Sequence, residues 1–350
     1  MEAGRSSARL PVKILIRATN WIGDAVMSLP ALRLVRQRFP EAHITVLGRP
    51  WVLDLYSRES FPNETVPFTG SSFSQKYALV VSLRRMRFDC AILFQNAFEA
   101  AALAFAARIP QRIGYARDGR SPLLTSAVRV PRPGQIPGHE SYYYLELLRR
   151  AGLTNAPFPE APEIRLEGAE QACANGTRLL AAAGLEPPAI GISPGAAYGG
   201  AKRWLPERFA EAAVAIARAS GRPVALFGSA AERDVCGLIA SQAAAQQVPA
   251  VNFAGETTLA RFIDMAAACS VFLTNDSGAM HIASALGVPT VAIFGATDHA
   301  ATGPTGAHSR VVRHPVECSP CLLRECPIDH RCMTRVGAAE VAETALHLLK

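Results

Sequence analysis

The carboxylate of Asp24 lies at a position in the chain where it could act as a catalytic group. It follows Gly23 in the segment NWIGDAVM, where an apolar run ends and a helical pattern begins. A carboxylate there can accept the proton of a substrate hydroxyl as a general base, and it can equally serve as the N-cap of the helix. Both interpretations stay open from these residues alone. The segment lacks the GxGxxG pattern, which disfavours a nicotinamide-dependent dehydrogenase.

A glycine-rich loop with two cations is the second candidate. In GISPGAAYGGAKRWLP a strand-like run ends at Ser193, Gly195 follows, and Lys202 and Arg203 come shortly before Pro206, which suits the first turn of a helix. Glycines let backbone amides approach an anion closely, and cations add charge at the same place. The loop is therefore predicted to bind phosphate. A flexible turn with a solvated basic pair is the alternative.

The third candidate is TNDSGAMHIASALG, residues 274–287. It contains a carboxylate, Asp276, at a position that would otherwise suit a bound anion. The apolar runs on either side predict a strand, a short helix ended by glycine and a second strand. Asp276 or Ser277 is expected to cap the helix, which leaves amides near Gly278 facing a ligand. His281 lies among small and apolar residues and is expected to be a packing residue without a catalytic role.

The loop GATDHAATGP, residues 295–304, follows the last strongly apolar run. Thr297 and Asp298 have the polar groups of a ligand-facing loop at the carboxyl end of a strand. Ordinary turn chemistry explains the same residues equally well.

Half of the eight cysteines cluster near the C-terminus, at Cys318, Cys321, Cys326 and Cys332. They could enclose zinc, with His330 as a further candidate ligand. Their spacing is not that of paired CxxC ribbons, so reduced structural thiols and an oxidation-prone loop remain alternatives. The other cysteines are scattered singly, and the N-terminus does not resemble an export signal. Both features predict a reduced, cytoplasmic setting.

Composition and charge narrow the class of protein. Of the 350 residues 49% are apolar, which excludes a disordered chain, and no uninterrupted apolar run reaches the ~18 residues of a membrane span. Residues 1–10 are expected to form a loose leader. The net charge of +7 is uneven, because residues 1–160 carry +9 and residues 161–350 carry −2. The basic half predicts an anionic partner such as nucleic acid, lipid headgroups or a phosphorylated substrate, with a general solubility bias as the alternative.

Compact β-branched runs without polar alternation predict strands covered on both faces of a parallel sheet. These runs are residues 12–17, 43–48 and 90–95 in the first half, and residues 189–193, 223–229, 251–255, 270–275 and 290–295 in the second. The proline-rich stretch 154–163 predicts a linker. The expected architecture is α/β, with two doubly wound parallel-sheet domains, residues 1–160 and 161–350, facing a cleft at the carboxyl ends of their strands.

Four stretches together resemble one family. They occur in order over roughly residues 12–335 and read NWIGDAVMSLPAL, PGAAYGGAKRWLPERFAE, TNDSGAMHIASALGVPTVAIFGATD and CSPCLLRECPIDHRCM. This combination is similar to the ADP-heptose:lipopolysaccharide heptosyltransferases of glycosyltransferase family 9. The resemblance implies a GT-B architecture of two Rossmann-like domains. Residues 1–160 would bind the acceptor and residues 161–350 the ADP-sugar, with a last helix that can pack back on the first domain.

The resemblance also implies roles for individual residues. Asp24 would be the catalytic base, and Lys202 would hold the donor diphosphate. The other residues implied in donor binding are Ser193, Gly195, Asp276, Ser277, Gly278, Thr297 and Asp298. An inverting transfer needs a base on the acceptor hydroxyl and a group that stabilises the departing diphosphate, and Asp24 and Lys202 meet these two needs.

The implied activity is an inverting transfer of L-glycero-D-manno-heptose from ADP-heptose to the first heptose of the lipopolysaccharide inner core. The implied partners are ADP-heptose, a heptosyl-Kdo2-lipid A type acceptor and the inner membrane surface, contacted peripherally from the cytoplasm, and no nucleic acid. No cofactor would be required for the chemistry, and structural zinc stays open. The alternatives are a family member that adds the first or a later core heptose, and a non-catalytic nucleotide- or polyanion-binding module.

Overall fold

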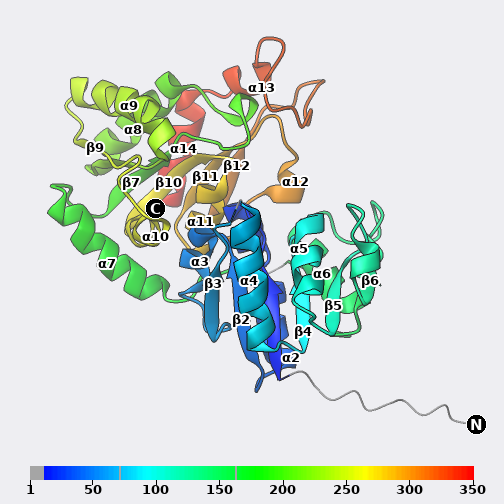
Figure 1. The fold of residues 1–350 in the computed structure, drawn as a ribbon. Helices are drawn as coiled ribbons and strands as arrows, with labels where there is room; N and C mark the ends of the chain where they lie inside the picture. Colours follow the sequence, from blue (N-terminus) through cyan, green and yellow to red (C-terminus); the bar gives the residue numbers. More distant parts are fainter. Residues whose placement is uncertain (1–11, 71, 162–163) are drawn as a thin grey trace, which may run out of the picture. The chain divides into compact units, whose positions relative to one another are not determined.

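The computed structural model describes residues 12–350 apart from residue 71 and residues 162–163. Its strands form two six-stranded sheets, each in one of two compact units (Figure 1). The chain passes from the first unit to the second between Phe158 and Pro159. The expected leader, residues 1–10, and part of the expected linker lie outside the described residues.

The first sheet has the strand order β3-β2-β1-β4-β5-β6, and its neighbouring strands are parallel. The strands are β1 (Lys13–Arg17), β2 (His43–Gly48), β3 (Glu64–Pro67), β4 (Cys90–Leu93), β5 (Gln111–Tyr115) and β6 (Ser126–Val128). The helices of this unit are α2 (Leu29–Arg38), α3 (Pro50–Tyr56), α4 (Phe73–Met86), α5 (Phe98–Ala106) and α6 (Ser141–Arg150). β1, β2 and β4 confirm the strands predicted in this half, and β3, β5 and β6 were not predicted.

The second sheet has the strand order β12-β11-β10-β7-β8-β9 and is also parallel. The strands are β7 (Ala189–Ser193), β8 (Val224–Leu226), β9 (Ala250–Asn252), β10 (Cys269–Asn275), β11 (Thr290–Ile293) and β12 (Ser309–Val312). The helices are α7 (Ala169–Ala182), α8 (Pro206–Ser220), α9 (Arg233–Ala245), α10 (Leu259–Ala267), α11 (Gly278–Ala285), α12 (His299–Thr302), α13 (Arg331–Thr334) and α14 (Ala338–Leu348). β7 to β11 confirm the predicted strands, and the α/β class with two doubly wound parallel sheets is confirmed.

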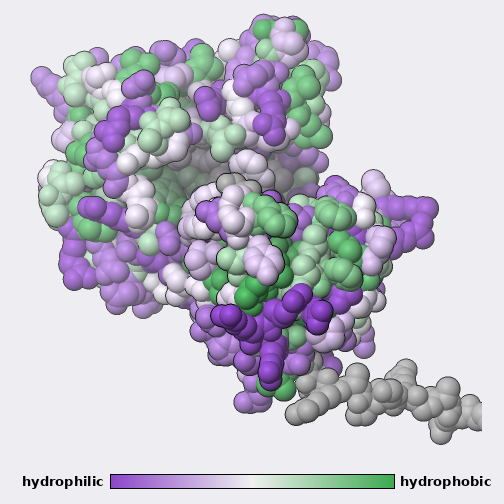
Figure 2. All heavy atoms as spheres, viewed as in Figure 1, coloured by the Kyte–Doolittle hydropathy of each residue, from purple (hydrophilic) through white to green (hydrophobic). Residues whose placement is uncertain are grey.

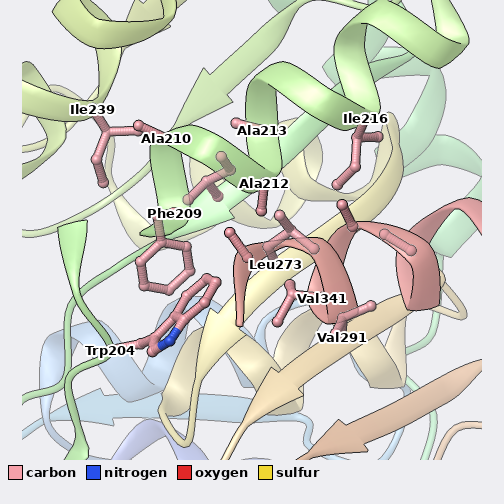
Figure 3. Close-up of a cluster of buried hydrophobic side chains, with 14 of the residues drawn as sticks. Trp204, Phe209, Ala210, Ala212, Ala213, Ile216, Ile239, Leu273, Val291 and Val341 are labelled. Atoms are coloured by element: carbon pink, nitrogen blue, oxygen red, sulfur yellow. The ribbon is translucent and has the colours of Figure 1, made fainter. Parts of the chain in front are cut away.

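An apolar core joins the second sheet to α8 and α14 (Figure 3). Trp204 is 1% exposed, and its ring meets that of Phe209 edge-on with 4.8 Å between centroids. Its indole Nε1 donates to the Val336 carbonyl at 3.2 Å, which satisfies the buried polar group. Val341 of α14 is fully buried in the same cluster. The last helix is therefore anchored on α8 within the second unit.

Two short segments of the first half belong to the second unit. One is residues 21–27, which contains α1 (Ile22–Met27), and the other is residues 138–140. The Glu140 amide donates to the Ala301 carbonyl at 2.9 Å, which ties the second segment to α12. The consequence for the site is that Asp24, carried by α1, groups with the second sheet. The assignment of acceptor binding and donor binding to the two halves stays a prediction.

Candidate functional site

The candidate site lies at the carboxyl edge of the second sheet, around β7 and β10. The chain leaves β7 toward β8 on one side, whereas β10 lies on its other side. Thr274 is in register with Ser193, so the two strands end together. Ligands of open parallel sheets bind where the strand order reverses in this way. The segment after β7, which we call the Lys202 loop (residues 194–203), and the segment after β10 both begin at this point.

Asp276 has two partners at this edge. Lys202 Nζ lies 2.5 Å from Asp276 Oδ2, and Thr297 Oγ1 donates to the same oxygen at 2.6 Å. The Asp276 side chain is 5% exposed and that of Lys202 13%, so the ion pair lies largely out of water. Removal of either charge would leave the other buried and uncompensated. The structure thus brings together predicted residues from the loops after β7, β10 and β11.

The predicted capping of α11 by a side chain is wrong. Ser277 occupies the N-cap position without a side-chain capping hydrogen bond, and its hydroxyl lies 3.2 Å from Thr274 Oγ1. The carboxylate of Asp276 is engaged by Lys202 instead. The nearly buried carboxylate is satisfied by charge-assisted hydrogen bonding to the Lys202 ammonium group, so it does not need a backbone amide. The N-terminus of α11 therefore has no cap from these two side chains.

Asn275 is a site residue that the sequence did not single out. Its Oδ1 accepts from the Trp204 amide at 2.9 Å, and its Nδ2 donates to the Pro194 carbonyl at 2.6 Å. This buried side chain ties the end of β10 to the first residue of the Lys202 loop and to the residue that follows the loop. The clue in the sequence was an amide at the end of a buried strand, because a buried amide needs partners.

Glu232 is a second residue that sequence reasoning missed. Its carboxylate lies against Gly195, where an added Cβ would fall 1.7 Å from Glu232 Oε1. Ser229 donates to this carboxylate from its amide at 2.7 Å and from its hydroxyl at 2.9 Å. The stretch SAAE has the pattern of an ordinary capping box, which hid its location beside Gly195. Glu232 gives this edge an acceptor group for ligand hydroxyls.

The helix α1 packs on α11 through two close approaches. A Cβ added to Gly278 would lie 2.9 Å from Ile22 Cβ, and one added to Gly23 would lie 3.0 Å from His281 Cδ2. Glycine at both positions permits this contact. Asp24 stands in the first turn of α1 and is partly buried. The candidate base therefore lies on a helix that packs against α11, the helix that follows β10.

His281 is a buried, neutral group of the site, 6% exposed. Burial is the main cause that lowers its pKa to about 4. The charge of Asp276 opposes this shift, and His139 and Lys202 add to it. At pH 7 the imidazole is uncharged, which suits a ring packed against Gly23 of α1.

Acidification should destabilise the protein through His281. The imidazole binds a proton near pH 6.5 when unfolded but only near pH 4 when folded, so its contribution to stability is full above pH 6.5 and falls as the pH drops toward 4. At pH 5 protonation of the unfolded chain should lower the free energy of unfolding by about 2 kcal/mol. Urea denaturation at pH 7 and pH 5 measures this for the wild type and His281→Asn. An equal loss in both proteins would contradict it.

The two polar residues after β11 have different partners. Asp298 is the N-cap of α12, and its side chain accepts from the Ala300 amide at 2.9 Å. Thr297, its neighbour, is the one that reaches Asp276. The side chain of Asp298 therefore has the capping role of an ordinary turn residue, whereas Thr297 contacts the Lys202–Asp276 ion pair.

The cysteine-rich segment, residues 318–332, braces the Lys202 loop. The Ala201 amide donates to the Arg324 carbonyl at 2.9 Å, and His330 Nε2 lies 3.0 Å from the Ala201 carbonyl oxygen. A Cβ added to Gly199 would lie 2.2 Å from the Arg324 carbonyl oxygen, so this approach needs glycine. Through these contacts the cysteine-rich segment positions the Lys202 loop, a role that no motif in the sequence indicated.

The cysteines themselves do not form a metal centre in the described part of the chain. No group of three or more His, Cys, Asp or Glu side chains there is arranged to hold a metal ion. Cys318 is exposed and Cys332 is buried, and both are free thiols. Burial raises the pKa of Cys332, and the neighbouring cysteines raise it further. Among the described residues, these side chains do not form the tetrahedral set that a structural zinc needs.

Two arginines of the first unit are buried, which the charge count did not reveal. Arg17 donates to the Ala18 carbonyl at 2.8 Å and to Asn20 Oδ1 at 3.1 Å, and Arg120 donates to Asn96 Oδ1 at 3.1 Å. Burial lowers the pKa of each to about 10, so both remain charged at pH 7. Part of the positive charge of the first half is therefore internal.

The chain is similar to known proteins along most of its length. Residues 76–331 match the family model of glycosyltransferase family 9 (heptosyltransferase). Lipopolysaccharide heptosyltransferase 2 of Salmonella typhimurium (strain LT2) is 33% identical over 311 residues, which cover 86% of this chain and 88% of that protein. The protein of the same name from Escherichia coli (strain K12) is 33% identical over 310 residues, with the same coverage.

A solved structure shares the fold. E. coli ADP-heptose lps heptosyltransferase II matches with a TM-score of 0.80 and 31% sequence identity, over 96% of this chain and 98% of that one. The two parallel six-stranded sheets described above correspond to its two Rossmann-like domains, the GT-B fold.

Proposed function

Because the chain belongs to glycosyltransferase family 9, the heptosyltransferases, we propose that it moves L-glycero-D-manno-heptose from ADP-heptose to the first heptose of the lipopolysaccharide inner core. One observation carries the proposal: the chain is 33% identical to a lipopolysaccharide heptosyltransferase 2 over 86% of its length. Membership of the family makes the protein a glycosyltransferase. That removes the alternative of a non-catalytic polyanion-binding module.

Lys202 is the proposed cation for the diphosphate of the donor. Asp276 holds its ammonium group at the point where β7 and β10 end. The N-terminus of α11 directs the positive end of its dipole to the same edge. When the bond between the sugar and the diphosphate breaks, the leaving group gains negative charge, which these fixed positive groups stabilise.

Glu232 is suited to the nucleoside part of the donor. Its carboxylate follows β8 at the same edge as Gly195. An acid near the carboxyl ends of such strands accepts hydrogen bonds from ribose hydroxyls in nucleotide-binding sheets. We therefore add Glu232 to the proposed donor site, beside Ser193 and Gly195.

Asp24 is the proposed catalytic base. It would take the proton of the acceptor hydroxyl while the hydroxyl oxygen bonds to the anomeric carbon. The bond from that carbon to the diphosphate breaks on the opposite face, so the configuration inverts. The packing of α1 on α11 supports this role, because it holds the base and the donor-binding residues in one unit.

The mechanism needs no metal ion, since Lys202 and α11 supply the positive charge. We expect the rate of transfer in excess EDTA to stay within about twofold of the rate without it, as the chemistry has no Lewis acid to lose. ADP release measured with and without the chelator checks this. Metal analysis of protein purified without chelator should find well below one zinc per chain. Loss of transfer in EDTA that added zinc restores would contradict the proposal.

The proposed acceptor is of the heptosyl-Kdo2-lipid A type, which carries phosphates and carboxylates. The charge of +9 on residues 1–160 favours such an anionic partner. Within the described ranges, none of the helices combines the length and apolarity needed to cross a bilayer. We propose that the protein reaches its lipid-linked acceptor by peripheral contact with the inner membrane from the cytoplasm, and that nucleic acid is not a partner.

An ADP-release assay with a series of acceptors tests the proposed function. The acceptors would carry zero, one or two heptoses, each with ADP-heptose. We expect turnover with the one-heptose acceptor and no ADP release without an acceptor. Turnover on the acceptor without heptose would instead assign the addition of the first heptose. Turnover only on the acceptor with two would assign a later step.

A further inference from the structure

The helix α5 is apolar on the side that faces solvent as well as on the side that faces the core. Its sequence is FEAAALAFA, with Glu99 as the only charged residue. Ala101 and Leu103 are buried in the core of the first unit, whereas Phe98 is 53% exposed and Phe105 52%. A helix that is apolar all round normally has both sides covered. The outer side of α5 is therefore a surface that favours a partner.

The helix α4 extends this surface. Phe73 is 86% exposed and Tyr77, one turn further on, is 64% exposed. Lys76 of α4 lies between them in sequence and forms an ion pair with Glu99 of α5 at 2.6 Å. The pair joins the first turns of the two helices, so the aromatic side chains lie on adjoining helices. We call Phe73, Tyr77, Phe98 and Phe105 the aromatic face.

Exposed cations lie at the C-terminal ends of the two helices that carry the aromatic face. Residues 72–112 contain six Lys and Arg against two acids, Asp89 and Glu99. Glu99 is paired with Lys76, and Asp89 accepts hydrogen bonds from backbone amides at the start of β1. The exposed cations that remain are Arg84, Arg85, Arg87 and Arg108. Figure 2 shows apolar side chains gathered over α4 and α5 and a hydrophilic group at the lower end of α4.

We propose that the aromatic face docks on a bilayer surface that contains anionic phospholipid. Exposed aromatic side chains enter the boundary between headgroups and acyl chains, and flanking arginines attract the negative headgroups. The charge is the observation that selects a membrane over another protein, because four exposed arginines lie at the C-terminal ends of these two helices, where the carboxylate of Asp89 is engaged by backbone amides. The inference rests on the proposed function and deepens it by naming the surface that brings the enzyme to its lipid-linked acceptor.

Sedimentation with vesicles tests the proposal on the full chain. The vesicles would be equimolar phosphatidylglycerol and phosphatidylethanolamine, with pure phosphatidylcholine for comparison, and would contain no acceptor. Phe73→Ser combined with Phe105→Ser should weaken binding to the anionic vesicles by about tenfold or more, because apolar area buried in the bilayer is lost. Arg85→Gln should weaken it about fivefold at low salt, the effect of one charge at the surface. Leu238→Ser, at a 41% exposed leucine of α9 in the second unit, is the matched control and should bind as the wild type does.

The outcomes separate this inference from the proposed function. Unchanged binding of the aromatic double variant, equal binding to the phosphatidylcholine vesicles, or no binding by the wild type would overturn the aromatic face as a membrane site. Turnover on a deacylated, water-soluble acceptor provides the second readout. That turnover should be the same in the double variant and the wild type, since the aromatic face touches no reacting atom. Vesicle binding that depends on the face, without turnover on any acceptor, would support this inference and refute the proposed function.

Discussion

Asp24→Asn should lower kcat for heptose transfer by about 100-fold or more while leaving the Kd of the donor nearly unchanged. Asparagine has the shape of aspartate but cannot take the proton of the acceptor hydroxyl. The fold of α1 should survive, because its close contacts with α11 run through Ile22 and Gly23. ADP release gives kcat, and calorimetry with ADP-heptose gives the donor Kd.

A matched carboxylate controls for a general effect of charge removal. Asp54 is also partly buried and also lies on a helix that follows a strand, α3 in the first unit. Asp54→Asn should leave kcat within about twofold of the wild type, as for a surface change away from special features. Near-normal turnover in Asp24→Asn would remove Asp24 from the mechanism. A large loss of donor affinity in that variant would point to a binding role instead.

Lys202→Met should lower kcat/KM by about 100-fold or more. The variant loses the cation proposed for the diphosphate, whose contribution is largest as the leaving group gains charge. It also leaves the nearly buried carboxylate of Asp276 with Thr297 as its remaining donor in the ion-pair cluster. Arg203→Met is the matched control, since Arg203 is adjacent and donates to the Ala196 carbonyl at 3.2 Å. Equal losses in the two variants would mean that the loop fold, and not the Lys202 charge, is what matters.

A double-mutant cycle separates the two roles open to Asp276. If Asp276 acts by holding Lys202, then Asp276→Asn combined with Lys202→Met should lose little more activity than Lys202→Met alone. If Asp276 also contacts the sugar, the two losses should add. The 2.5 Å separation of the charged groups favours the first result.

The central strands of both sheets could be predicted because their residues are compatible with few other structures. Runs such as KILIR and HITVLG are apolar on both sides of the strand, which only a sheet covered on both faces accommodates. The edge strand β3, with the sequence ETVP, is partly exposed and contains a proline, so its pattern is that of a loop. The short β6 and β12 are also partly exposed, which explains why they were not predicted.

The partners of the site residues could not be read from the sequence. The pairing of Asp276 with Lys202 joins residues 74 positions apart. The predicted helix cap involved residues that are neighbours in the sequence, and a single sequence indicates only such local contacts. The bracing of the Lys202 loop by the segment around Arg324 depends on a contact of carbonyl and amide groups, which leaves no mark in side-chain chemistry. Long-range contacts of this kind need the fold.

The grouping of residues 21–27 with the second unit bears on how acceptor preference can diverge among relatives. Asp24, the base that we propose, lies in the same unit as the residues that we propose to bind the donor, although it belongs to the opening segment of the chain. On this proposal, the remainder of the first unit can change toward a new acceptor without moving Asp24 away from α11. Chimeras of two homologues would have to keep residues 21–27 and the second unit from the same parent. Crossovers placed on either side of residues 21–27 would keep α1 matched to the α11 it packs on, and a single crossover near residue 158 would separate them.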